Sequence, residues 1–93
     1  MRTYTASRLT KGNKVFPSKI TIDDLGVTFK DPGLFSAKEK TIPFSKIASV
    51  DTDSPMLGYS TIIIETTGEG RIHAHGFKKD EVIEMKELIL KRI

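Results

Sequence analysis

Two runs of alternating polar and apolar residues flank a glycine-containing segment between Tyr59 and His75. A period of two is typical of β-strands that are buried on one face only. Residues 66–70 contain two glycines and are the expected turn. If this turn has an odd number of residues, apolar side chains face each other and an acid faces a base. The resulting antiparallel hairpin pairs Ile62 with Ala74, Ile64 with Ile72, and Glu65 with Arg71.

Five further segments show short strand-like patterns bounded by turn residues, at positions 3–7, 19–23, 27–30, 38–44 and 47–50. The sequence Asp31-Pro32-Gly33 predicts a type II turn, because proline presets φ and glycine accepts a positive φ. Pro43 has no N–H to donate, so we expect it at the end of its strand or on a sheet edge. Short connections between about seven strands predict antiparallel neighbours.

The pattern changes to a helical period after Phe77. Asp80 and Glu81 favour the helix N-terminus, and Lys91 and Arg92 favour its C-terminus, because of the helix dipole. We therefore predict a helix over about residues 79–92. Its wide apolar face is expected to be buried and to close the sheet structure. The seven apolar side chains of this face are Val82, Ile83, Met85, Leu88, Ile89, Leu90 and Ile93.

The order of seven antiparallel strands and one C-terminal amphipathic helix resembles the bacterial pleckstrin-homology (PH)-like domain family. The similarity runs over residues 18–93 and rests on the motifs ITID at 20–23, GVTF at 26–29, TIPFSKI at 41–47 with Val50, TIIIET at 61–66 and GFKKD at 76–80. It implies a mainly β (α+β) fold, a seven-stranded antiparallel barrel or bent sandwich capped by the helix. We expect residues 1–93 to form one such domain, with strands over about 3–75. Many domains of this kind bind phosphoinositides, acidic lipids, peptides or protein partners.

Four basic residues lie in and around the expected loop between the first two strands: Arg8, Lys11, Lys14 and Lys19. Lipid-binding PH domains carry basic residues at this loop, so the resemblance implies a weak, salt-sensitive contact with an anionic membrane. The alternative is a solvated surface that keeps a small domain in solution. The second strand reads Lys19-Ile20-Thr21 where a Lys/Arg-x-Arg pair is usual, so no arginine is available for a bidentate phosphate contact. This departure argues against specific inositol-phosphate recognition.

The segment from Ser54 to Tyr59 places Met56, Leu57 and Tyr59 in an otherwise polar connection. Exposed apolar residues at a loop tip mark a partner or membrane contact. The alternative is that they fold back and cover the core. The neighbouring Asp51 and Asp53 argue against insertion into an anionic membrane.

We expect no metal site, cofactor or catalytic centre. His73 and His75 share one strand face with Thr61 and Ile63 as cross-strand neighbours, but zinc sites use three or four ligands. The chain has no cysteine, no G-x-S-x-G or H-E-x-x-H motif and no glycine-rich phosphate loop. The five phenylalanines lack the adjacent basic residues of a base-stacking surface, so we expect no nucleic-acid binding.

The sequence therefore predicts a non-enzymatic binding or assembly module that engages a protein partner or self-associates. The absence of cysteine favours a reducing cytoplasm. The longest aliphatic runs contain three residues, whereas a membrane span needs about 20. The alternative function is a peripheral module at the inner face of the membrane that binds anionic lipid through the basic loop.

Overall fold

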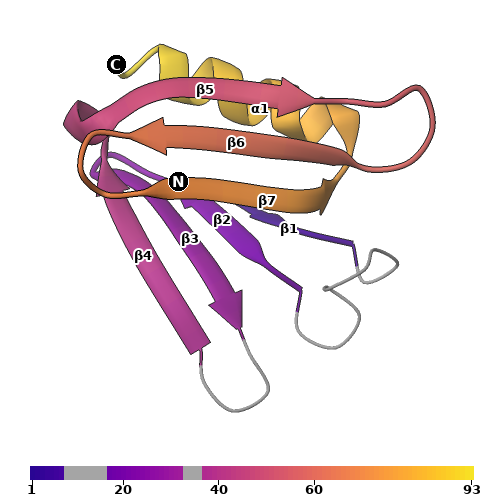
Figure 1. The fold of residues 1–93 in the computed structure, drawn as a ribbon, viewed down its shortest axis with the longest axis horizontal. Helices are drawn as coiled ribbons and strands as arrows, with labels where there is room; N and C mark the ends of the chain where they lie inside the picture. Colours follow the sequence, from indigo (N-terminus) through magenta and orange to yellow (C-terminus); the bar gives the residue numbers. More distant parts are fainter. Residues whose placement is uncertain (8–16, 33–36) are drawn as a thin grey trace.

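In the computed structural model, which describes residues 1–7, 17–32 and 37–93, seven strands form two antiparallel sheets (Figure 1). The first sheet contains, in chain order, β1 (Arg2–Thr5), β2 (Lys19–Ile22), β3 (Gly26–Pro32) and β4 (Ala37–Pro43). The second contains β5 (Ile47–Asp53), β6 (Ser60–Thr66) and β7 (Arg71–Phe77). A 3₁₀ helix, η1 (Phe44–Lys46), joins the sheets, and the helix α1 (Lys79–Leu90) follows β7. The predicted seven-stranded, helix-capped architecture is confirmed.

The β6–β7 hairpin has the register predicted from the sequence. Ile62 pairs with Ala74, Ile64 with Ile72, and Glu65 with Arg71. The four apolar members of these pairs are buried, and the Oε1 atom of Glu65 lies 3.0 Å from the Nε atom of Arg71 on the outer face. The pairing of apolar with apolar residues and of acid with base therefore selected the correct register.

Some element boundaries differ from the sequence prediction. Asp31 and Pro32 form the end of β3, so the predicted turn at 31–33 is wrong for these two residues, and Gly33 lies outside the described residues. Pro43 ends β4 as predicted, and Phe44 turns into η1 and is buried there. The strand β5 continues to Asp53 because its pairing with β6 persists as far as Asp53 and Thr61.

The helix α1 packs on β5, β6 and β2 and closes one cluster of buried side chains. Val82, Met85 and Ile89 are fully buried, and Leu88 is partly buried against the same cluster. In contrast, Ile83, Leu90 and Ile93 are 43%, 49% and 50% exposed. The predicted burial of all seven apolar side chains is wrong for these three. The helix lies against the sheets along one stripe, so residues on its flanks stay accessible.

A backbone hydrogen bond joins the two sheets just after β1, where the Ser7 N–H donates to the Gly76 carbonyl of β7 at 2.8 Å. Within the second sheet, the Thr67 N–H donates to the Lys46 carbonyl at 2.8 Å and extends the pairing of β5 with β6 into η1. Figure 1 shows the far half of the β3–β4 hairpin extending away from the second sheet. The inner face of this half is therefore not covered by the opposing strands.

Candidate functional site

The loop between β5 and β6 presents two apolar side chains to solvent. Met56 is 103% exposed and Leu57 is 89% exposed, whereas Tyr59, just before β6, is half-buried. Figure 1 shows that this loop extends beyond the sheets, at the end opposite the C-terminus. The sequence left open whether these residues fold back over the core, and Met56 and Leu57 do not. We call Met56 and Leu57 the tip.

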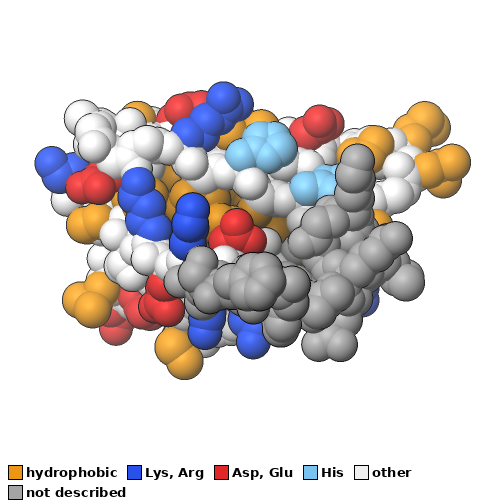
Figure 2. Space-filling view, turned by 60° about the horizontal axis from the view of Figure 1, so that its bottom comes forward, with side chains coloured by type: hydrophobic (Ala, Val, Ile, Leu, Met, Phe, Trp, Pro, Cys, Tyr) orange, Lys and Arg blue, Asp and Glu red, His pale blue; other side chains and the backbone are white. Residues whose placement is uncertain are grey.

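Acidic and imidazole side chains lie on the outer face of the second sheet, next to the tip. Asp51 on β5 and His73 on β7 both pair with Ile63 of β6, and Asp53 and His75 both pair with Thr61. The Oγ1 atom of Thr61 lies 2.7 Å from the Nδ1 atom of His75, and Figure 2 shows both imidazoles at the surface. The predicted neighbours of the two histidines are confirmed. One strand separates the carboxylates from the imidazoles, and no group of three possible metal ligands occurs in the described ranges.

Of the predicted basic patch, only Lys19 lies in the described part of the chain, and Arg8, Lys11 and Lys14 lie outside the described residues. Lys19 is exposed on β2, directly opposite the exposed Lys30 of β3. Like charges that face each other on a sheet repel. Glu39 of β4 faces Lys30 from its other side and offsets part of this charge, and an anion beside Lys19 would offset the rest. The next row of this face is built of threonines, with Oγ1–Oγ1 distances of 3.1 Å between Thr3 and Thr21 and 2.8 Å between Thr28 and Thr41.

Polar contacts attach β1 to the helix. The Tyr4 hydroxyl donates to Oε1 of Glu84, and the Arg2 guanidinium forms an ion pair with the same carboxylate. Burial raises the pKa of the Tyr4 phenol, and the hydrogen bond to Glu84 and the charge of Glu84 raise it further. A phenol with a raised pKa stays neutral and keeps donating its proton. We interpret this contact as structural, because it joins the first strand to the closing helix.

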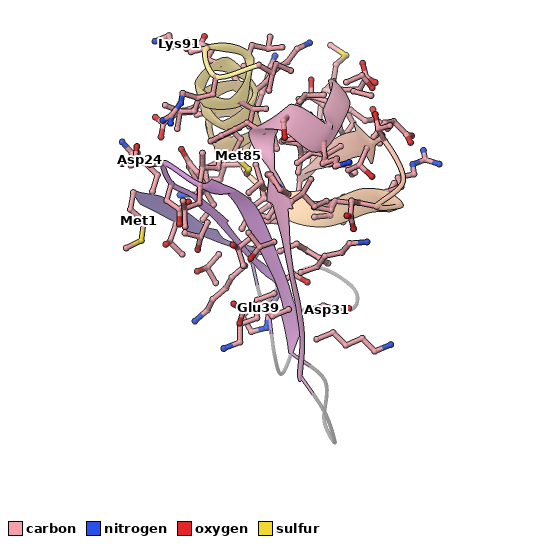
Figure 3. The ribbon with its side chains drawn as sticks, turned by 90° about the vertical axis from the view of Figure 1, so that its left-hand side faces the viewer. Met1, Asp24, Asp31, Glu39, Met85 and Lys91 are labelled. Atoms are coloured by element: carbon pink, nitrogen blue, oxygen red, sulfur yellow. The ribbon has the colours of Figure 1, made fainter. Side chains whose placement is uncertain are left out.

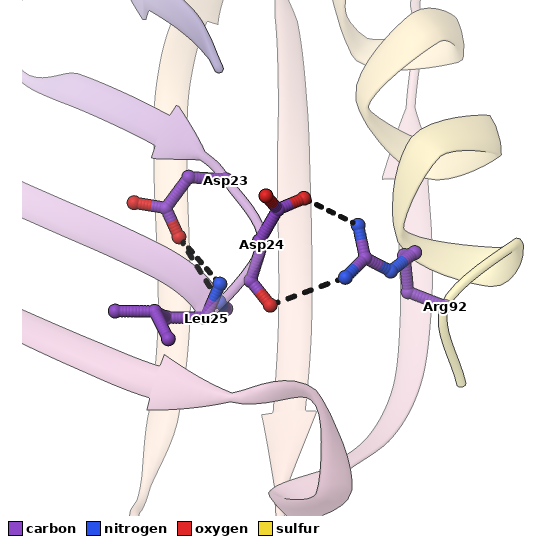
Figure 4. Close-up of polar contacts among 5 residues, drawn as sticks. Asp23, Asp24, Leu25 and Arg92 are labelled. Atoms are coloured by element: carbon purple, nitrogen blue, oxygen red, sulfur yellow. Dashed lines mark hydrogen bonds and ion pairs between the residues drawn. The ribbon is translucent and has the colours of Figure 1, made fainter.

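Arg92 attaches the end of the helix to the β2–β3 turn (Figure 4). Its Nη1 donates to Oδ1 of Asp24 at 3.2 Å, and its Nη2 donates to the Asp24 carbonyl at 3.1 Å. The guanidinium carbon also lies 4.9 Å from the centre of the Phe44 ring, within the range of a cation–π contact. From the sequence, Arg92 is expected only to favour the C-terminus of the helix through the dipole. The contact with Asp24 was not predictable, because the two partners are 68 residues apart and no local pattern links them.

A hollow of about 200 Å³ lies on the β3–β4 hairpin, between Phe29 and Asp31 on one strand and Lys38, Glu39 and Lys40 on the other. Figure 3 shows Asp31 and Glu39 on the part of the hairpin that lies far from the helix. The Lys40 ammonium group donates to the Glu69 carbonyl, which joins the rim of the hollow to the β6–β7 turn. This site was not predicted, because the turn expected at Asp31-Pro32-Gly33 ends the strand before Asp31. We call this hollow the socket.

Two sheets of four and three antiparallel strands, closed by a C-terminal helix, are the architecture of a PH-type domain. A model of the bacterial PH domain family matches residues 11–93, so the chain belongs to this family. No curated protein and no solved structure matches the chain. Across the described residues, no helix combines the length and the apolar character needed to cross a bilayer.

Proposed function

We propose that the chain is a non-enzymatic binding module that engages a protein partner through the tip. The observation that carries this proposal is the exposure of Met56 and Leu57 on a loop that extends beyond the sheets. Covering such a side chain is worth about 1.5–3 kcal/mol, so leaving two of them together in water is costly unless a partner covers them.

The charges around the tip favour a protein over an anionic membrane. Asp51 and Asp53 are exposed on the strand that leads into the tip. An anionic membrane surface would repel these carboxylates, whereas a protein surface with cations at matching positions would attract them. We therefore expect the partner surface to combine an apolar depression with basic residues.

The available hollows support a binding role without catalysis. Hollows on the described part of the chain measure about 180–200 Å³, below the roughly 300–1,000 Å³ of typical small-molecule sites. Among the described residues, a strongly raised pKa is found for Tyr4, whose phenol is held by Glu84. The proposal places the module in the cytoplasm, because a chain without cysteine is typical of reducing compartments.

The proposed role of the tip is tested by immobilising each variant and comparing the proteins that it retains from an extract of the source cells. The tip variant carries Met56→Ser and Leu57→Ser, and the matched control carries Leu25→Ser, because Leu25 is 78% exposed at the β2–β3 turn. We expect proteins that the wild type and the control retain and that the tip variant loses. Identical sets from all three chains would contradict the proposed role of the tip.

Anionic lipid is the second candidate ligand, favoured by the opposed Lys19 and Lys30. Co-sedimentation with anionic and neutral vesicles at low and high salt tests it. Binding to anionic vesicles that is lost at high salt and weakened by Lys19→Glu, but not by Lys91→Glu, would support it. Equally weak sedimentation with both vesicle types at low salt would exclude this function.

A further inference from the structure

We propose that the partner of the tip is a second copy of this chain, whose socket receives the tip. This inference rests on the proposed function, because it names the protein that the loop engages. Each copy carries both the tip on the β5–β6 loop and the socket on the β3–β4 hairpin. Figure 1 shows these two elements at separate places on the molecule, so the tip of a chain does not reach the socket of the same chain.

The socket has an apolar lining with charges at its rim. The Phe29 side chain is partly buried and packs against the core, which makes it a fixed wall. Lys38 and Lys40 contribute their aliphatic stems to this lining and place their ammonium groups at its rim. Because the Lys40 ammonium group is bound to the Glu69 carbonyl, its stem is held in place.

The volume of the socket suits one side chain of the tip. At about 200 Å³, it exceeds the roughly 150 Å³ of an apolar cavity that binds benzene. A leucine or methionine side chain is comparable in size to that ligand. Leu57, which is 89% exposed, would therefore occupy the socket, while Met56 would cover its rim.

The charges beside the tip and the socket are complementary and equally spaced. Asp51 and Asp53 lie two residues apart on the outer face of β5, and Lys38 and Lys40 lie two residues apart on the inner face of β4. Alternate residues of a strand are about 7 Å apart, so both carboxylates can meet both ammonium groups at once. Asp31 faces Lys38 across the hairpin and leaves the inner face with one net positive charge. Glu39 faces Lys30 on the outer face.

A contact between two different surfaces has a distinctive signature in mixing experiments. A tip variant, Met56→Ser with Leu57→Ser, keeps an intact socket. A socket variant, Lys38→Glu, keeps an intact tip. Each variant alone is expected to be a monomer, whereas an equimolar mixture forms a complex of two chains that cannot extend, with twice the 10.4 kDa mass of one chain.

Size-exclusion chromatography with light scattering measures these masses at protein concentrations up to about 1 mM, where a contact with a Kd near 1 mM is about half formed. We expect the wild-type mass to rise with concentration and the Leu25→Ser control to follow it. Charge reversal gives an independent check, because a double variant with Lys38→Glu and Asp53→Lys in the same chain should restore a contact that Lys38→Glu alone weakens. All changed residues are exposed, and circular dichroism verifies that each variant is folded.

Two results would overturn this inference. One is a wild-type chain that stays monomeric at about 1 mM, where even a Kd near 1 mM gives association. The other is a wild-type oligomer that persists in both the tip and the socket variants. If the wild type is monomeric while the tip variant still loses a retained protein, the proposed function stands and only the second copy as partner is excluded.

Discussion

At the scale of single residues, Gly26 occupies a position where the backbone of the paired strand leaves no room for a side chain. Asp23 shapes the β2–β3 turn, because its Oδ1 accepts hydrogen bonds from the N–H groups of Leu25 at 2.9 Å and Gly26 at 3.2 Å. Gly26 then enters β3 with a φ of +156°. A Cβ atom at this position would lie 2.1 Å from the Ile42 carbonyl oxygen of the paired strand. Only glycine allows β3 and β4 to approach this closely.

We predict that Gly26→Ala lowers the free energy of unfolding by at least about 3 kcal/mol, since the clash involves backbone on both sides. The matched control is Gly68→Ala, because Gly68 has a φ of +80° but nothing within 4 Å of the added Cβ. The control should cost only about 1–2 kcal/mol from backbone strain. Urea unfolding of the three proteins measures both values. Equal losses in the two variants would show that the close approach to Ile42 is unimportant.

The raised pKa of Tyr4 predicts that the folded chain loses stability at alkaline pH. Its pKa is raised in the folded chain, by burial first and then by Glu84, above the ordinary value of about 10. The contribution of Tyr4 is therefore complete below about pH 10 and is lost as the pH rises beyond it, because the unfolded chain then releases the proton first. We expect the unfolding free energy of the wild type to fall more steeply between pH 9.5 and 11 than that of Tyr4→Phe. Denaturant titrations at these pH values measure the difference, with Tyr59→Phe as the control. If the unfolding free energies of the wild type and Tyr4→Phe fall equally steeply with pH, the pKa of Tyr4 is not raised by folding.

At the scale of elements, the helix shows which contacts hold it to the sheets. Ile89 is fully buried and Ile83 is 43% exposed, although both are isoleucines of the same helix. We predict that Ile89→Ala costs about 2–5 kcal/mol through the lost contacts and the resulting cavity. Ile83→Ala should change stability by less than about 0.5 kcal/mol. Both variants replace isoleucine with alanine in the same helix, so their gain in helix propensity is the same and does not affect the comparison. Thermal or urea unfolding distinguishes the two, and similar losses would mean that the apolar face is as wide as the sequence suggests.

The elements that were predictable from sequence are those specified by neighbouring residues. The β6–β7 register followed from pairing Glu65 with Arg71, and the end of β4 followed from Pro43, which cannot donate a hydrogen bond. The extension of β3 through Pro32 was not predictable, because local turn propensity at Asp31-Pro32-Gly33 competes with pairing to β4. The exposure of Ile83 was also not predictable, because it depends on how the helix is rotated against the sheets. The spacing of apolar residues along the helix does not determine that rotation.

The candidate site also has one part that the sequence suggested, the tip, and one part that it did not, the socket. Met56 and Leu57 were recognisable as apolar residues in a polar loop, but their exposure depends on where the loop leaves the sheets. The socket requires the β3–β4 hairpin to extend beyond the second sheet, and no local signal encodes that overhang. Sequence therefore suggested one half of the proposed contact and gave no indication of the other.

At the scale of the whole molecule, two sheets are held together by a helix that is attached to the first sheet at two places. Oε1 of Glu81 caps the start of the helix by accepting from the Lys78 N–H at 2.9 Å, and Glu84, at the middle of the helix, binds Arg2 and Tyr4 of β1. At its end, Arg92 binds the β2–β3 turn. Both attachments reach the first sheet, while the body of the helix also packs on β5 and β6 of the second. The helix thus makes the folding of each sheet depend on the other.

We therefore predict that a chain ending at Lys78 does not unfold cooperatively. It loses the fully buried Val82, Met85 and Ile89, worth roughly 5–9 kcal/mol together, from a domain whose total stability is about 5–14 kcal/mol. A control chain ending at Leu90 keeps these side chains and loses Arg92, so it should retain a sharp transition and be less stable by about 1 kcal/mol. Circular dichroism during heating measures both. A sharp transition in the chain ending at Lys78 would mean that the sheets hold together without the helix, and that the helix only covers a core already formed between them.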